Sequence, residues 1–317
     1  MYFKKPLCLL LCTMVIGQLQ AQYNPDNHVV TLSKYYLEPM SSIENGSAEE
    51  RKEVMEENAK KMNPLQTKLI SSMTLWHYWT GKSNEVLEIH EWASLADADA
   101  TIMEAQDTRK KAWRKDEDRE EFMSNFNKYW TGKHTDVGVF ELNMDMVKRA
   151  SRPYKDNTIV TLTKFYLKPI SKVEDGSADD RKEVLQAWFD NVVKKNDKLL
   201  SHMMLMHYWT GSMGGSGGRP VILVNEYATM EDAMNEDFSE LVEKAWPDEE
   251  ERKAGDAVHH ADQLVISGRD QPVNQVALRA HPGGEWTAGL EFPDRWRIGD
   301  HEAPSATCGI AFPLSTD

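Results

Sequence analysis

Hydrophobic and polar residues follow the same order of segments twice along the chain. Stretches rich in β-branched and aromatic residues, which are typical of strands, lie at 29–37, 69–80 and 86–92, and again at 159–167, 199–210 and 221–227. Segments with helical spacing lie at 48–63 and 95–113, and again at 178–196 and 230–246. A last strand is expected to start near Val137 in the first series and near Leu264 in the second. Each series therefore predicts strand, helix, strand, strand, helix, strand.

The ends of these elements have recognisable signals. Pro39 and Pro169 end the first strand of each series, because proline lacks the amide that a strand needs. Ser47 and Ser177 each stand three residues before an acidic residue, the spacing of a helix-capping serine. The first helix of each series should therefore begin just after its serine.

The two series are similar in sequence as well as in pattern. Placing residue 28 over residue 158 aligns HVVTLSKYYLEPMSSIENGSAEERKEV with TIVTLTKFYLKPISKVEDGSADDRKEV without a gap. The same offset aligns WHYWTG at 76–81 with MHYWTG at 206–211. We therefore expect a unit of about 120 residues, a normal domain size, repeated in tandem over 28–149 and 158–268.

The second strand of each repeat is apolar on both of its faces. One face holds Leu75, His77 and Trp79, or Leu205, His207 and Trp209 in the second repeat. The other face holds Trp76 and Tyr78, or Met204, Met206 and Tyr208. A sheet covered on one side would alternate between apolar and polar residues. The predicted fold is therefore α+β, with helices on one face of each sheet and the other repeat's sheet on the opposite face.

This βαββαβ order, together with EWASLADADA at 91–100 leading into the second helix, resembles the dimeric α+β barrel superfamily. These ferredoxin-like domains include antibiotic-biosynthesis monooxygenase-like and haem-degrading proteins. The resemblance implies an intramolecular barrel of two repeats, and a ligand cavity between a sheet and its own helices. It does not supply a catalytic signature that this sequence matches.

His77 and His207 are the strongest candidate functional residues, because each is an ionisable group in the middle of an apolar strand. Beside Trp79 or Trp209, either histidine could exchange a proton with a ligand or bind haem iron. The alternative is a buried neutral imidazole that is hydrogen-bonded to a neighbour.

Two further groups recur in both repeats. His134 and Asp136, and likewise His260 and Asp262, are spaced so that an extended chain projects both side chains to one side. They could contact a ligand, although one imidazole and one carboxylate are too few for a metal site, and a turn role is the alternative. Glu91 and Glu226 follow the parity of apolar strand residues, so burial would raise the pKa of each for acid–base work, unless the strand ends are open to solvent.

The two ends of the chain differ from the repeats between them, and the first predicts where in the cell the protein is located. Residues 1–21 have two lysines followed by an apolar run and Ala21, which is the layout of a signal peptide and predicts a secreted or periplasmic protein. The apolar run is too short to span a membrane, and outside this segment Cys308 is the only cysteine. The tail at 271–317 differs in composition from both repeats and is expected to be disordered or out of frame.

The net charge of −14 argues against nucleic acid and anionic membranes as partners. We expect binding of a small, partly apolar ligand beside the sheet; the alternatives are a cofactor-independent monooxygenase, a haem-binding enzyme, and a structural protein without catalysis.

Overall fold

The structure is a computed structural model of the whole chain. It describes residues 26–77, 84–151, 158–167, 169–170, 173, 176–208, 219–235 and 238–248, together with the strand backbones of 275–279 and 307–313. The predicted signal peptide therefore lies outside the described residues.

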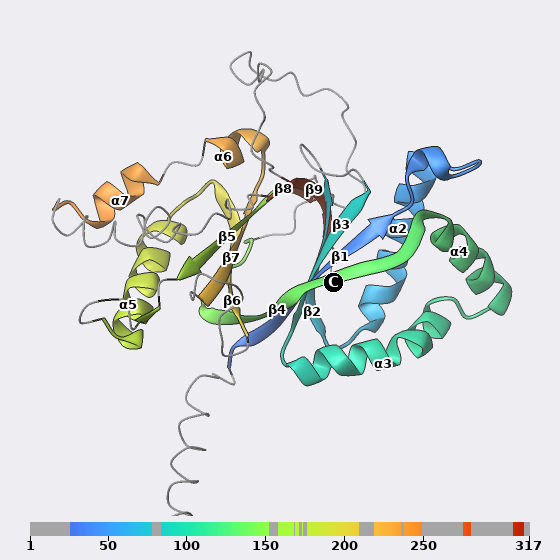
Figure 1. The fold of residues 1–317 in the computed structure, drawn as a ribbon, viewed down its shortest axis with the longest axis horizontal. Helices are drawn as coiled ribbons and strands as arrows, with labels where there is room; N and C mark the ends of the chain where they lie inside the picture. Colours follow the sequence, from blue (N-terminus) through green and yellow to red (C-terminus); the bar gives the residue numbers. More distant parts are fainter. Residues whose placement is uncertain are drawn as a thin grey trace, which may run out of the picture.

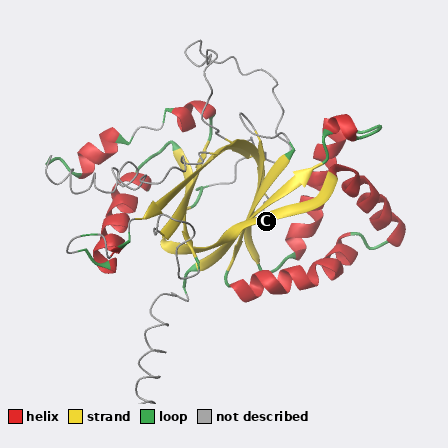
Figure 2. Ribbon diagram, viewed as in Figure 1, coloured by secondary structure: helices red, strands yellow, loops and turns green. Residues whose placement is uncertain are grey.

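The strands form one closed barrel at the centre of the molecule (Figure 2). Around the barrel the order is β1-β3-β2-β9-β8-β5-β7-β6-β4, and each pair is antiparallel except β8 with β9. The strands are β1 (His28–Leu37), β2 (Leu69–His77), β3 (Glu85–Trp92), β4 (Trp130–Lys148), β5 (Thr158–Leu167), β6 (Leu199–His207), β7 (Arg219–Tyr227), β8 (Gln275–Arg279) and β9 (Thr307–Pro313). The architecture is thus α+β with a barrel, as the sequence predicts.

Helices cover the outside of the barrel in two groups (Figure 1). The first group consists of α2 (Ala48–Met62), α3 (Leu95–Ala112) and α4 (Asp116–Tyr129), with short 3-10 turns η2 (Met40–Ser42) and η3 (Asn63–Leu65). The second group lies on the other side of the barrel and consists of α5 (Ala178–Trp188), the π-helical turn η5 (Phe189–Val193), α6 (Met230–Met234) and α7 (Ser239–Ala245). Among the described helices, none is long and apolar enough to cross a membrane.

The predicted capping serines start both first helices. The Ser47 hydroxyl accepts a hydrogen bond from the Glu50 amide at 3.0 Å, and Ser177 accepts one from the Asp180 amide at 3.0 Å. The Ser177 amide also donates to the Asp180 carboxylate at 2.8 Å, which completes a capping box. These contacts satisfy amides that the first helical turn leaves without partners.

The barrel interior is a single apolar core that draws on both halves of the chain. It contains Val30, Leu32, Met73, Leu75, Leu87, Ile89, Phe140, Leu142, Val160, Leu162, Met203, Leu205, Ile222 and Val224. On the opposite face, Trp76 packs with Met55 of α2, and Met204 packs with Phe189 of η5. Adjacent residues of β2 and β6 therefore point into different cores, which explains why both strand faces are apolar.

Two predicted elements differ from the structure. Strand β4 begins at Trp130 and not near Val137, because its first part lies exposed at the edge of β1 and is too polar to give an apolar signal. The helix expected over 230–246 is divided into α6, which ends at Met234 with Asn235 as its C-cap, and α7.

The last strand expected near Leu264 lies outside the described residues. Strand β8, from the predicted tail, pairs with β5 in the same way that β4 pairs with β1. The assignment of the tail and the boundaries of the two repeats stay predictions.

Candidate functional site

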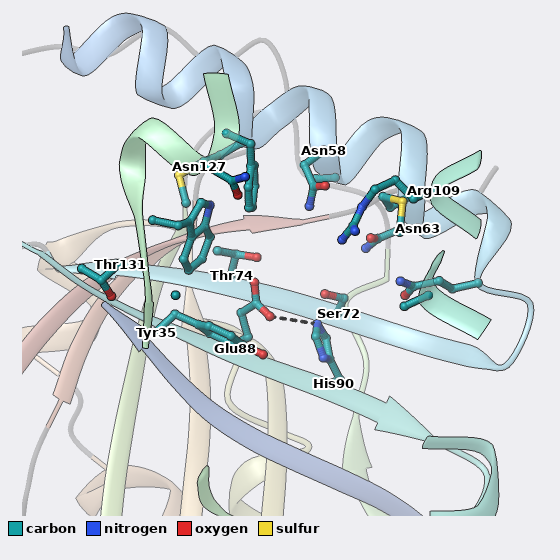
Figure 3. A pocket seen from close by; sticks show the side chains of 18 of the residues that line it. Tyr35, Asn58, Asn63, Ser72, Thr74, Glu88, His90, Arg109, Asn127 and Thr131 are labelled. Atoms are coloured by element: carbon teal, nitrogen blue, oxygen red, sulfur yellow. Dashed lines mark ion pairs between the residues drawn. The ribbon is translucent and has the colours of Figure 1, made fainter. Parts of the chain in front are cut away.

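A cavity of about 600 Å³ lies between the outer face of the first three strands and the helices α2, α3 and α4 (Figure 3). Its walls are formed by Tyr35, Met55, Asn58, Ala59, Met62, Asn63, Gln66, Ser72, Thr74, Glu88, His90, Ala105, Arg109, Phe126, Asn127, Trp130, Thr131, Gly132 and Lys133. Volumes of this order suit small organic ligands.

Strand alternation supplies the floor of the cavity. Leu87 and Ile89 of β3 point into the barrel core, so Glu88 and His90, which alternate with them, point outward to the helices. Ser72 and Thr74 of β2 reach the same face, since β2 pairs with β3 in the register Ser72 to His90 and Thr74 to Glu88.

Glu88 and His90 form the central ionisable pair of this floor (Figure 3). Glu88 Oε2 lies 3.7 Å from His90 Nε2, and the side chains are 22% and 27% exposed. Burial raises the pKa of Glu88 to about 7 and lowers the pKa of His90 to about 4. At neutral pH, Glu88 can therefore gain or lose a proton while His90 is a neutral imidazole.

One end of the cavity is aromatic. The Trp130 ring stacks with Phe126 at 5.2 Å and meets Tyr35 edge-on at 5.3 Å between centroids. Burial, aided by the charges of Glu88 and Asp136, raises the pKa of Tyr35 to about 12, so its hydroxyl stays protonated. The Trp130 indole nitrogen is buried and has no hydrogen-bond partner among the described residues. A ligand ring with an oxygen substituent could use all three side chains.

The other end of the cavity is polar. Figure 3 shows Arg109 of α3 and Asn58 of α2 pointing into the cavity above Ser72 and His90. The Arg109 Nε atom is buried and has no hydrogen-bond partner within the described part of the chain. This end therefore offers hydrogen-bond donors to a ligand.

His207 does not take the place that the sequence predicts for it. It is only 7% exposed and follows the parity of Leu205, which points into the barrel core and away from the helices. It does not line the cavity. The expectation of a strand histidine between the sheet and its helices was therefore wrong for His207, because the helix-facing parity of this strand is the other one.

The side chains of several other predicted site residues lie outside the part of the chain that the structure describes. His77 ends β2, where its backbone pairs with Gly309, but its side chain is outside the described part. Trp79, Trp209, His260 and Asp262 also lie outside the described residues. Their predicted ligand contacts stay predictions.

Glu91 is buried, as expected, but its hydrogen-bond partners lower its pKa, whereas the sequence predicted a raised pKa. It is 1% exposed and accepts hydrogen bonds from both terminal nitrogens of Arg149, from Ser71 Oγ at 2.6 Å and from His28 Nδ1 at 2.6 Å. Burial alone would raise the pKa of Glu91, but these donors together hold it below its usual value. The expectation of a raised pKa was wrong, since a carboxylate with this many donors is stabilised in its charged form.

Glu226 is the corresponding carboxylate of the second half. It is 1% exposed and accepts hydrogen bonds from Ser201 at 2.6 Å and Thr158 at 2.7 Å. Both glutamates therefore tie neighbouring strands together at the end of the barrel, and neither lines the cavity.

His134 and Asp136 lie within β4 and project to the same side, as their spacing predicts. His134 Nε2 lies 3.7 Å from Asp136 Oδ1, and the side chains are 52% and 79% exposed. His134 stacks on Tyr35 with 5.7 Å between centroids. His134 therefore contacts a residue that lines the cavity, but it is not itself part of the cavity wall.

The central pair and Arg109 were missed by the sequence reasoning. Glu88 and His90 alternate with apolar residues, which is also the pattern of a solvent-facing strand side. One available signal was that both faces of the second strand are apolar, which indicates that helices cover the outer face of the sheet. The neighbouring third strand, which carries Glu88 and His90, must face the same helices. Nothing in the sequence distinguishes Arg109 from the other basic residues of its helix.

The equivalent face of the second half carries mostly apolar side chains among the described residues. The strand registers match Glu88 with Leu223, Thr74 with Met204, and His90 with Asn225. Met204 packs there with Phe189, Phe165, Trp188 and Leu223. The His202 ring, fully buried, bonds Asn225 at 2.6 Å, and burial lowers its pKa to about 4. The ionisable pair of the first half therefore has no counterpart at these positions.

No family model and no curated protein matches the sequence. The chain is similar to several solved structures. One is a proposed monooxygenase from Lactobacillus acidophilus, with 12% identity and a TM-score of 0.40 over 80% of this chain and 92% of that one. Another is an anthrone oxidase-like protein, with 14% identity and a TM-score of 0.38 over 84% of this chain and 98% of that one. A variant of the chlorite dismutase of Candidatus Nitrospira defluvii is also similar, with 12% identity and a TM-score of 0.36 over 74% of this chain and 89% of that one. At TM-scores this low, the α+β barrel assignment rests on the strand order and the core described above.

Proposed function

We propose that the protein binds a small aromatic molecule bearing an ionisable hydroxyl group in the cavity of its first half, and that Glu88 exchanges a proton with this molecule. One observation carries the proposal: a carboxyl group whose pKa is about 7 faces a cavity with an aromatic end and a polar end. Groups that titrate near the working pH are the most effective general acids and bases.

The surroundings of Glu88 support this role. Thr74 and His90 flank it on the cavity floor, and neither carries a charge at neutral pH. A hydroxyl group held beside Trp130 and Tyr35 would therefore meet Glu88 as the nearest proton acceptor. Proton transfer would leave the ligand as an electron-rich anion, the form that a cofactor-independent monooxygenase would require. Catalysis of this kind is the enzyme alternative of the proposal.

The described residues do not fit the haem alternative. His207 points into the barrel core, so it cannot reach an iron in the cavity. His90 does face the cavity, but its Nε2 atom is directed at Glu88 Oε2, 3.7 Å away. An iron bound to that nitrogen would have to displace the carboxyl group. We therefore derive no step through haem.

We also infer that the two halves are tandem copies of one unit and that only the first copy holds this site. The shared strand registers and capping serines support a common origin. The apolar packing of Met204, Leu223 and Phe189 supports a structural role for the second copy. The layout of residues 1–21 supports a secreted or periplasmic location.

Binding is tested by tryptophan fluorescence during titration with methyl 4-hydroxybenzoate, a neutral hydroxylated aromatic probe. Ala59 lines the cavity from α2, so Ala59→Trp fills the space and should abolish saturable binding. Ile102 of α3 is 71% exposed, so Ile102→Trp adds the same ring outside and should leave binding unchanged. Equal binding by wild type and Ala59→Trp, or none by wild type, would refute the proposed site.

Two further measurements separate the enzyme alternatives. Oxygen uptake with polyphenols should rise with pH through about 7 in the wild type and be lost in Glu88→Gln, if Glu88 is the base. Titration with haemin should give no bound-haem absorbance band that depends on His90 or His207. A band that disappears in His90→Ala would contradict the exclusion of haem.

A further inference from the structure

We infer that the polar end of the cavity binds an anionic group, so that the ligand is an aromatic carboxylate and Arg109 is its anchor. This inference deepens the proposed function, because it concerns the same cavity and names the class of ligand.

Arg109 is a partly buried arginine that lines the cavity and has no acidic partner among the described residues. Arg149 pairs with Glu91, and Arg219 pairs with Glu141 at 3.3 Å. Arg109, by contrast, forms no ion pair with a carboxylate of the described residues, and its Nε atom is buried without a hydrogen-bond partner there. A cation that is partly shielded from water and has no counter-charge is less stable than a paired one. A ligand that supplies the missing negative charge would therefore gain more than a neutral one.

The groups around Arg109 suit a carboxylate in particular. The guanidinium group is a planar fork of donors that matches the two oxygens of a carboxylate. Asn58 and Asn63 add amide donors, and Ser72 adds a hydroxyl from the floor. Figure 3 shows these four side chains at the same end of the cavity. They can satisfy several oxygen lone pairs at once.

The one carboxyl group in the cavity wall does not compensate Arg109. Glu88 lies on the floor beside His90 and forms its contact there. The other charged wall residue is Lys133, which follows the aromatic end on β4. The wall thus places an unpaired cation at the end opposite to Trp130.

The two ends of the cavity define the shape of the ligand. Trp130 and Phe126 offer ring faces at one end, and Arg109 offers the anion-binding fork at the other. The Glu88 carboxyl group lies between them (Figure 3). A single aromatic ring that carries a carboxylate and a hydroxyl group would occupy both ends.

Isothermal titration calorimetry with 4-hydroxybenzoate and its neutral methyl ester tests this inference on the full chain. The acid should bind the wild type about tenfold to a hundredfold more tightly than the ester, which is the range for a charge-assisted hydrogen-bonded pair. Arg109→Gln should remove this preference and leave ester affinity within about twofold. Arg109→Lys keeps the charge but not the fork, so it should retain part of the preference.

Lys110→Gln is the matched control, because it removes one positive charge from an exposed side chain of the same helix that pairs with Asp107. It should leave the preference for the acid intact. Equal affinity of the wild type for acid and ester would overturn the inference while leaving the proposed binding of aromatic molecules standing. Equal loss of acid and ester affinity in Arg109→Gln would assign Arg109 a structural role and also overturn it. If neither compound binds the wild type, the proposed function fails together with the inference.

Discussion

Replacing Glu88 by glutamine should change the pH dependence of stability in a way that exposes the buried carboxyl group. Burial raises the pKa of Glu88 from 4.5 in the unfolded chain to about 7 in the folded protein. A group with a raised pKa contributes its full stability below the unfolded value and loses it as the pH rises through the folded value. The wild type should therefore lose stability between about pH 4.5 and pH 7 on account of this residue.

The size of the effect follows from the same shift. Each pKa unit corresponds to about 1.4 kcal/mol, so ionisation of Glu88 costs the folded state up to about 3 kcal/mol above pH 7. Glutamine has nearly the same shape but no proton to lose. Glu88→Gln should therefore be more stable than the wild type by up to about 3 kcal/mol at pH 8.5, and equal to it near pH 4.

Urea unfolding followed by tryptophan fluorescence at pH 4, 6, 7 and 8.5 measures this difference. The depressed pKa of His90 acts with the opposite sign, because burial disfavours its charged form, but it acts in both proteins and cancels in their difference. Glu104→Gln is the control, since it removes one negative charge from a side chain that is 59% exposed. A stability difference for Glu88→Gln that does not grow with pH would refute the raised pKa and the proton-transfer role built on it.

Three further changes test other contacts by the same unfolding assay. Arg149→Met leaves the buried Glu91 carboxylate without its cation and should cost about 3 kcal/mol. Lys60→Met, at a helix-surface pair, should cost under about 1 kcal/mol; similar costs would contradict a structural role for the Arg149–Glu91 pair. Gly132 has a φ of 72° with open space where a Cβ would lie, so Gly132→Ala should cost about 1–2 kcal/mol through the backbone alone; no measurable loss would show that the segment relaxes. Ser177→Ala removes a capping box and should cost about 1 kcal/mol, and restoration by Ser177→Asp would confirm that the cap is responsible.

The order of helices and strands was accessible from the sequence because it depends on local signals. The capping serines, the strand-ending prolines and the alternation of apolar residues act within a few positions of each other. The apolar pairs Leu75 with Trp76 and Leu205 with Met204 also indicated that both sheet faces are covered, and the two sets of cores confirm this.

The site depended on tertiary structure, because it arises from how distant segments meet. Glu88 and His90 have the alternation of a solvent-facing strand, and only the packing of α2, α3 and α4 over them creates a cavity that shifts their pKa values. His207 was expected to face the helices of the second half. The sequence shows that neighbouring residues of a strand face opposite ways, but not which of them faces the helices. The alternation of side chains between two faces is a local property of a strand. Which face meets the helices, and which side chains lose contact with water, is decided only when the barrel folds.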